Sequence, residues 1–279
     1  MNAPRRPLAA LAAACVLSVS GCGWFGGEPE APIETRAPED IYSAAQARLK
    51  DDSPRAAAKL FDEVERLYPY SETAKKAMLM SAYASYEAAE YDDAITAAQR
   101  YIGFYPSDAQ TDYARYLVAQ SYYEQIVDVG RDQGVTEEAM KALRELIARH
   151  PESEYVDDAK LKLDTTLDQL AGKEMEVGRY YLKRGNNLAA INRFQRVVKE
   201  YDTTTHVEEA LHRLVESNLA LGLVEEAKAA GAVLGYNYPG GEWYEDSYAM
   251  LTDSGAVVGE DRDSWYTRAY RQIIRGDWL

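Results

Sequence analysis

Residues 157–202 constrain the fold of this chain more than any other stretch of its sequence. They predict one long helix, a tight turn at residues 184–187, and a second helix that ends near Tyr201. Gly178 and Ala190 are small residues, which let two antiparallel helices approach closely. Aromatic rings close to them in the sequence would fill the space beside this contact. The stretch therefore predicts a tightly packed helical hairpin.

Similar units follow one another along the chain, because helix-ending boundaries recur at intervals of 37, 45, 51 and 37 residues. Proline stops a helix, so four of these boundaries are marked by a Pro. The intervals are close to the 34-residue period of the tetratricopeptide (TPR) repeat, with insertions. Each hairpin exposes an apolar face that only its neighbour can cover. We therefore predict an all-α, TPR-like superhelix of about five repeats, with boundaries at Tyr68-Pro69, Tyr105-Pro106, His150-Pro151, Tyr201-Asp202 and Tyr238-Pro239.

Two insertions divide this array. The third repeat has an enlarged loop around residues 128–135, and the first helix of the fourth repeat extends back to about Glu154. A helix of roughly thirty residues is about 45 Å long. We expect it to join an N-terminal group of three repeats, residues 40–151, to a C-terminal pair, residues 152–241.

The remaining residues, 242–279, form a C-terminal extension that ends in an aromatic and arginine-rich segment, residues 261–279. Trp265 and Ile273 lie at helical spacing within it. The segment is either a helix that caps the last repeat or a handle for a partner or for lipid headgroups. Both interpretations stay open at this stage.

The beginning of the chain is typical of an exported lipoprotein. Arg5 and Arg6 precede an uncharged run at residues 8–19, which is too short to span a membrane and typical of a signal peptide, residues 1–21. Val19-Ser20-Gly21-Cys22 resembles the bacterial lipobox, which makes Cys22 the predicted lipid attachment site. The alternative is a soluble periplasmic protein with an incidental cysteine.

A mature protein that begins at Cys22 would carry several fatty-acyl chains, such as palmitate, and stable anchoring needs more than one chain. Residue 23 is glycine, whereas an aspartate at that position retains many lipoproteins in the inner membrane, so we expect the outer membrane. Residues 22–39 are rich in Gly, Pro and acidic residues, and we interpret them as a flexible lipidated tether.

Composition argues against several classes of function. The net charge of −15 argues against a nucleic-acid partner, because phosphates need clustered Lys and Arg. The three histidines lack metal-ligand spacing, and no phosphate loop or Cys-His pair occurs. We expect neither a metal nor a cofactor, and we interpret the protein as non-enzymatic. Tyrosine is overrepresented, with 22 Tyr against 4 Phe. These rings either form a binding surface or stiffen ordinary repeats.

The order of these features resembles the BamD family, lipoproteins of the β-barrel assembly machine (BAM complex) of the outer membrane. The strings at residues 112–117, 177–181 and 234–239 are similar to the corresponding BamD repeats. The resemblance covers nearly all of the mature chain. TPR-like repeats alone are unspecific, so its weight rests on the order of the repeats, their insertions and the lipobox together.

The resemblance implies a periplasmic scaffold, lipid-anchored to the outer membrane, that assists the folding and insertion of β-barrel proteins. Its C-terminal repeats would bind the POTRA region of BamA, with other BAM lipoproteins as further partners. Its N-terminal repeats would receive C-terminal segments of unfolded outer-membrane proteins, which are extended and aromatic. A concave groove lined by tyrosines suits such segments, and the candidates are Tyr83, Tyr86, Tyr116, Tyr122 and Tyr123. Candidates for the BamA-facing surface are Arg193, Arg196 and Lys199.

Three alternatives remain at this stage. A TPR lipoprotein that serves as an adaptor for peptidoglycan synthases or an envelope protease would share the lipobox and repeats but not need the long helix. A pilotin-like lipoprotein would have fewer repeats. An envelope hydrolase would need a catalytic constellation, which the sequence lacks.

Overall fold

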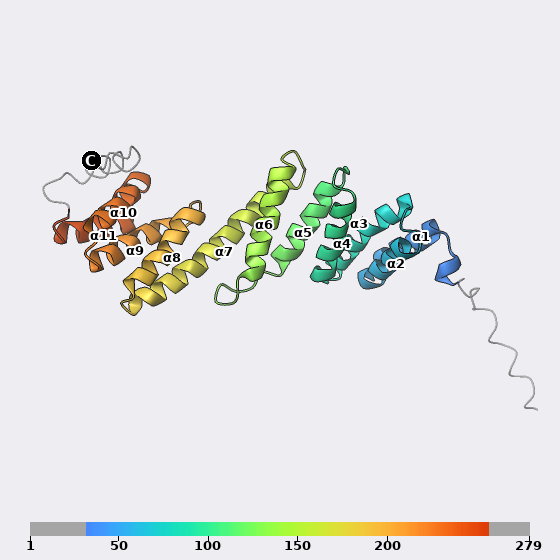
Figure 1. Ribbon diagram of the computed structural model, residues 1–279, viewed down its shortest axis with the longest axis horizontal. Coiled ribbons are helices and arrows are strands. Elements are labelled where there is room, and N and C mark those ends of the chain that lie inside the picture. The colour runs from blue at the N-terminus through green and yellow to red at the C-terminus, as the bar shows by residue number, and fades with distance from the viewer. Residues whose placement is uncertain (1–31, 257–279) are drawn as a thin grey trace, which may run out of the picture.

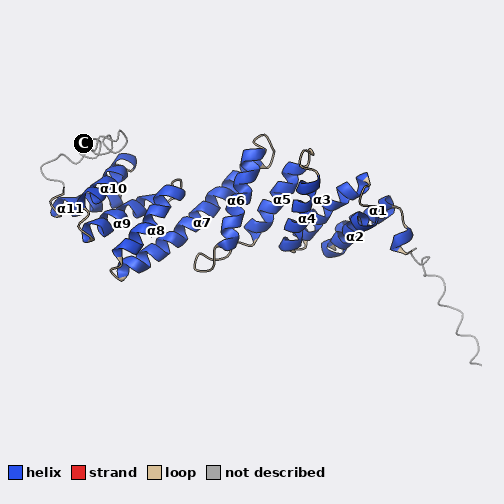
Figure 2. Ribbon diagram, viewed as in Figure 1, coloured by secondary structure: helices blue, strands red, loops and turns tan. Residues whose placement is uncertain are grey.

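The computed structural model describes residues 32–256, and within this range every regular element is a helix (Figure 2). A short 3₁₀ helix, η1 (Ile33–Thr35), precedes the α-helices. These are α1 (Pro38–Lys50), α2 (Pro54–Leu67), α3 (Glu72–Glu87), α4 (Tyr91–Phe104), α5 (Thr111–Glu124), α6 (Gly134–Arg149), α7 (Val156–Lys183), α8 (Asn187–Glu200), α9 (Val207–Ala220), α10 (Val224–Asn237) and α11 (Glu242–Asp253).

The helices stack side by side in one elongated row, each packed mainly against its neighbours in the sequence (Figure 1). Successive pairs from α1–α2 to α9–α10 form the hairpins of five repeats, and α11 packs against both α9 and α10. The prediction of an all-α, TPR-like array is confirmed for the described part of the chain.

The odd-numbered helices also contact one another: α1 with α3, α3 with α5, α5 with α7, and α9 with α11. The first helices of the N-terminal repeats therefore share one face of the row. The even-numbered helices lie on the other side of each hairpin.

The fourth repeat has the close helix contact that its small residues predict. Gly178 of α7 is buried against Phe194 of α8, and a Cβ added to this glycine would lie 2.8 Å from the ring Cζ and 2.9 Å from Cδ1. Gly185 turns the chain between the two helices with a φ of 71°, in the left-handed region that favours glycine. The side chain of Asn186 then caps α8 by accepting a hydrogen bond from the backbone N–H of Ala189.

Helix α7 contributes to two hydrophobic cores. Ala159 in its first half packs with Leu143 and Leu146 of α6, whereas Leu170 and Met175 belong to the C-terminal core. The helix has 28 residues, close to the predicted length, and begins two residues after Glu154.

The enlarged loop of the third repeat, residues 125–133, reaches the middle of α7. Gln169 donates a hydrogen bond to the backbone carbonyl of Val127, and Lys173 donates to that of Gly130 at 3.2 Å. The insertion is therefore a contact between the third repeat and the long helix rather than a free loop.

The prediction that the tether extends to residue 39 is wrong at its C-terminal end. Ile33 packs against the first core, and the carbonyl of Arg36 accepts a hydrogen bond from the Tyr68 hydroxyl. Glu39 already lies in α1 and accepts a hydrogen bond from Thr73 at 2.9 Å. Apolar Ile33 and these two bonds hold residues 33–39 on the first repeats. The signal peptide, Cys22 and residues 261–279 lie outside the described residues.

Candidate functional site

Tyrosine rings from α3, from α5 and from the residue that precedes α7 gather on the face that these odd-numbered helices share. Tyr116 of α5 stacks on Tyr155, the residue before α7, with ring centroids 4.6 Å apart. Tyr113 lies 5.4 Å from the same ring. On α5, positions 113, 116, 120 and 123 recur at helical spacing and so share one side of the helix. We call the group formed by the following residues the tyrosine face: Tyr83, Tyr86, Tyr113, Tyr116, Tyr123 and Tyr155.

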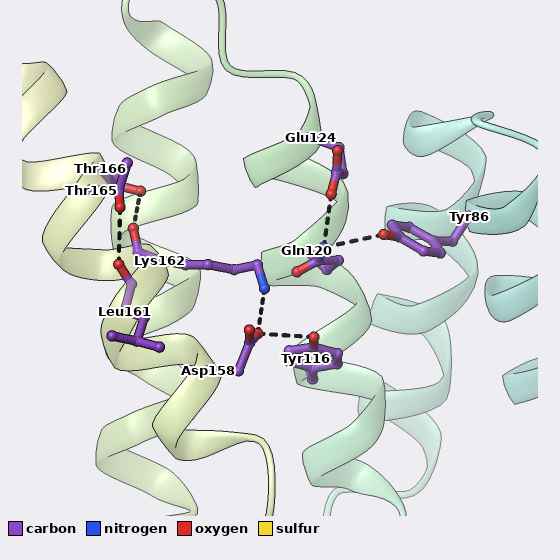
Figure 3. Close-up of polar contacts among 9 residues, drawn as sticks. All are labelled: Tyr86, Tyr116, Gln120, Glu124, Asp158, Leu161, Lys162, Thr165 and Thr166. Carbon is purple, nitrogen blue, oxygen red and sulfur yellow. Dashed lines mark hydrogen bonds and ion pairs between the residues drawn. The ribbon is translucent and has the colours of Figure 1, made fainter.

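Polar side chains connect this face across the helices (Figure 3). The Tyr116 hydroxyl donates to Asp158 of α7 at 2.9 Å, and Lys162 forms an ion pair with the same carboxylate. The Lys162 ammonium also lies 5.9 Å from the ring centre of Tyr116 and 5.6 Å from that of Tyr123. These are cation–π distances. The second and third repeats are connected separately, because Gln120 of α5 donates to the Tyr86 hydroxyl of α3 at 3.1 Å.

The hydroxyls of Tyr86, Tyr113 and Tyr116 have raised pKa values and stay neutral over the whole physiological pH range. Burial raises the pKa of Tyr116, and the hydrogen bond to Asp158 raises it further. Burial likewise raises the pKa of Tyr113 and Tyr86. Burial acts to raise the pKa of Asp158 as well, but hydrogen bonds from Lys162 and Tyr116 lower it overall. The face thus combines neutral phenols, an ionised carboxylate and one lysine, which suits hydrogen bonding and ring stacking.

The structure does not bring Tyr122 to this face. Burial raises its pKa, followed by the negative charges of Glu138 on α6 and Asp92 on α4. Its hydroxyl therefore lies toward the even-numbered helices. Tyr122 and Tyr123 are consecutive, so their side chains leave α5 about 100° apart. Tyr83 and Tyr86 of α3 lie close enough to Tyr113 of α5 to raise its pKa. With Tyr116 and Tyr123, which share the Lys162 ammonium, they are the predicted groove residues that the structure does bring together.

The predicted partner-binding arginines of α8 contact a buried carboxylate that the sequence reasoning missed. Glu174 of α7 is 7% exposed and pairs with Arg193 at 3.1 Å and with Arg196 at 2.9 Å. Arg196 also pairs with Glu200 at 2.9 Å, whereas Lys199 is exposed on the same helix. Both arginines thus stabilise the contact between α7 and α8. Each still exposes more than a third of its side chain.

Glu174, Gln120 and Lys162 were not predicted from the sequence. The sequence does contain a pattern that could have indicated two of them: Gln120 lies four residues after Tyr116, and Lys162 lies four residues after Asp158, so each pair shares one side of its helix.

In residues 32–256, no group of His, Cys, Asp and Glu could hold a metal ion, and no helix is long and apolar enough to cross a membrane.

The sequence model of the YfiO family, described as an outer membrane lipoprotein, matches residues 34–234. The outer membrane protein assembly factor BamD of Caulobacter vibrioides is 49% identical over 251 residues, which cover 90% of this chain and 82% of that protein. The chain belongs to the BamD family.

Other BamD proteins are similar in sequence to this chain over most of their length. The BamD of Rickettsia prowazekii is 41% identical, covering 79% of this chain and 86% of that protein. The BamD of Neisseria meningitidis serogroup A is 34% identical, covering 80% and 88%. The resemblance drawn from residues 112–117, 177–181 and 234–239 is thereby confirmed.

Proposed function

We propose that this chain is an outer-membrane-anchored periplasmic scaffold of the BAM complex that binds BamA and assists the folding and insertion of β-barrel proteins. The observation that carries the proposal is the tyrosine face on the N-terminal repeats, in a chain whose relatives are named outer membrane protein assembly factors. No catalytic step is part of this function. The anchor would be acyl chains on Cys22, and the other BAM lipoproteins are further partners.

The tyrosine face would receive extended, aromatic segments of unfolded outer-membrane proteins. Its rings offer flat apolar surfaces for aromatic side chains, and its hydroxyls offer hydrogen bonds. The surface spans α3, α5 and the start of α7, so a segment of several residues could lie across it. Residues 40–151 supply most of it.

The C-terminal repeats would hold the POTRA region of BamA. Arg193, Arg196 and Lys199 lie together on α8, at a distance along the row from the tyrosine face (Figure 1). The two arginines keep part of their donors accessible while Glu174 orients them. A partner carboxylate would add to this network rather than replace it.

The first test is affinity purification of the tagged lipoprotein from gently solubilised outer membranes, followed by mass spectrometry. The proposal predicts a stoichiometric POTRA-bearing barrel protein. Recovery of peptidoglycan synthases or a protease instead would favour the adaptor alternative. A parallel sample of Cys22→Ser, which cannot be acylated, is expected in the soluble periplasmic fraction.

Peptide binding is tested with matched tyrosine variants. Tyr116→Ala removes a ring of the tyrosine face, whereas Tyr122→Ala removes a ring of the same helix whose hydroxyl lies toward Asp92 of α4 and Glu138 of α6. Binding of a labelled barrel-protein peptide should weaken about tenfold in the first variant and less than twofold in the second, as for loss of a stacking contact. Equal effects of the two substitutions would refute the assignment of the face.

A further inference from the structure

Gln120 carries an unused hydrogen-bond acceptor in the middle of the tyrosine face. Its side chain is only 8% exposed, and its amide nitrogen donates to Tyr86 at 3.1 Å and to Glu124 at 2.8 Å (Figure 3). A carboxylate can only accept, so Glu124 determines which end of the amide is the nitrogen. The carbonyl oxygen, Oε1, is buried and has no hydrogen-bond partner among residues 32–256. Buried polar atoms without a partner are uncommon, so this oxygen is a candidate acceptor for a donor that residues 32–256 do not supply.

Lys162 lies over the same side of α5 as Gln120, because its ammonium is within 6 Å of the ring centres of Tyr116 and Tyr123. Figure 3 shows its side chain reaching from α7 toward Gln120, on the side of the carbonyl oxygen. Its ammonium pairs with Asp158 rather than with Gln120. An ammonium has three N–H donors, and its four-carbon stem is flexible. Because the Gln120 carbonyl oxygen is buried, a side chain of the face has to move before a segment reaches it, and the flexible Lys162 is the side chain drawn reaching toward it.

An acceptor and a donor on the same face match the groups of a polypeptide main chain. An extended segment carries N–H and C=O groups that no secondary structure satisfies. We propose that Gln120 Oε1 accepts a main-chain N–H of such a segment, while Lys162 donates to a main-chain carbonyl nearby. The proposal rests on the proposed function, because it specifies how the tyrosine face would hold its segment.

The charges of the face favour the interior of a segment over its free C-terminal carboxylate. The negative charges of Glu87 and Glu124 lie close enough to the Tyr86 hydroxyl to raise its pKa, and Lys162 already forms an ion pair with Asp158. A carboxylate has no N–H to offer Gln120 and would meet these acidic groups. A neutral amide has both a donor and an acceptor. Main-chain recognition also explains how one face could serve segments of different sequence, with the rings adding a preference for aromatic side chains.

The test is an ester scan of a fluorescein-labelled ten-residue peptide with alternating aromatic and polar residues. Each peptide replaces one main-chain N–H by an ester oxygen, and its binding to the full-length chain is measured by fluorescence anisotropy. On the unaltered chain, we expect one ester position to weaken binding three- to tenfold. In Gln120→Met that position should lose its effect, because the acceptor is gone.

The controls separate this proposal from the one on which it rests. Gln99→Met, an exposed substitution on α4, should leave the ester profile unchanged. If Gln120→Met does not fold, Gln120→Asn takes its place, because the shorter side chain holds its carbonyl oxygen closer to the α5 backbone and farther from the bound segment. A flat ester profile on the unaltered chain, or a sensitive position that persists in the Gln120 variant, would overturn main-chain recognition. If no all-amide peptide bound at all, segment binding itself would fail.

Discussion

Gly178→Ala should destabilise the chain although alanine is the better helix former. The added methyl group would lie 2.8 Å and 2.9 Å from two ring carbons of Phe194, where carbon atoms normally lie at roughly 3.5–4.0 Å. Phe194 is fully buried, so its ring has no space into which it can move. Overpacking of this kind costs about 1–3 kcal/mol, and a contact so short lies near the upper end of that range.

Alanine offsets part of this cost, because glycine is about 1 kcal/mol less favourable within a helix. The net loss is therefore about 2 kcal/mol, which lowers the Tm by about 4–8 °C for a chain of this size. Thermal unfolding followed by circular dichroism at 222 nm measures the shift. Urea unfolding provides an independent value of the free energy.

Two further variants check the physical reason. Gly103, near the end of α4, has no atom within 4 Å of its Cβ position, so Gly103→Ala should leave the Tm unchanged or raise it. In the Gly178→Ala background, Phe194→Leu should cost less than in the original chain, because the smaller side chain removes the clash. An unchanged or raised Tm for Gly178→Ala would refute the reasoning.

Two other predictions concern carboxylates that are paired with basic side chains. Glu174→Gln should lower the free energy of unfolding by about 2 kcal/mol, less than the roughly 3–5 kcal/mol of a fully buried pair, because its arginine partners stay partly hydrated. Urea unfolding measures this loss, and the exposed Glu200→Gln should cost at most about 0.5 kcal/mol. A hydrogen bond from Lys75, with others, lowers the pKa of Asp108 from 3.8 to about 2. A lowered pKa adds stability that is complete above the unfolded-state pKa, near pH 4, and is lost as the pH falls toward 2. Asp108→Asn should therefore flatten the stability curve between about pH 4 and pH 2, and parallel curves for the two proteins would contradict this assignment.

The repeat architecture could be predicted because it depends on local rules. Proline boundaries, small residues and the apolar period place the hairpins, and the long helix was predicted to begin at Glu154, two residues before its observed start. The enlarged loop was also predicted, but its contact with α7 was not. That contact depends on which residues the stacking brings together, and sequence spacing carries no such distance.

The candidate site was predictable only in part, for a similar reason. Tyr116 and Tyr123 share a side of α5 because seven residues are close to two helical turns. Tyr122 was grouped with them by residue type, although its neighbouring position turns it toward other helices. Glu174 was missed because an isolated acidic residue has no pattern. Only the packing of α8 onto α7 brings it to Arg193 and Arg196.

The continuous helix α7 sets the relative rotation of the two groups of repeats. Each residue of an α-helix advances the chain by about 1.5 Å and turns it by about 100°. Deleting one residue between the two cores, near position 165, would therefore leave both groups able to fold while turning one against the other by more than a quarter of a circle. The tyrosine face and the α8 arginines would then point in a new relative direction. The number of residues in this helix therefore fixes the angle between the two groups of repeats. Natural chains of this architecture should tolerate changes of loop length far better than the insertion or deletion of one residue within α7.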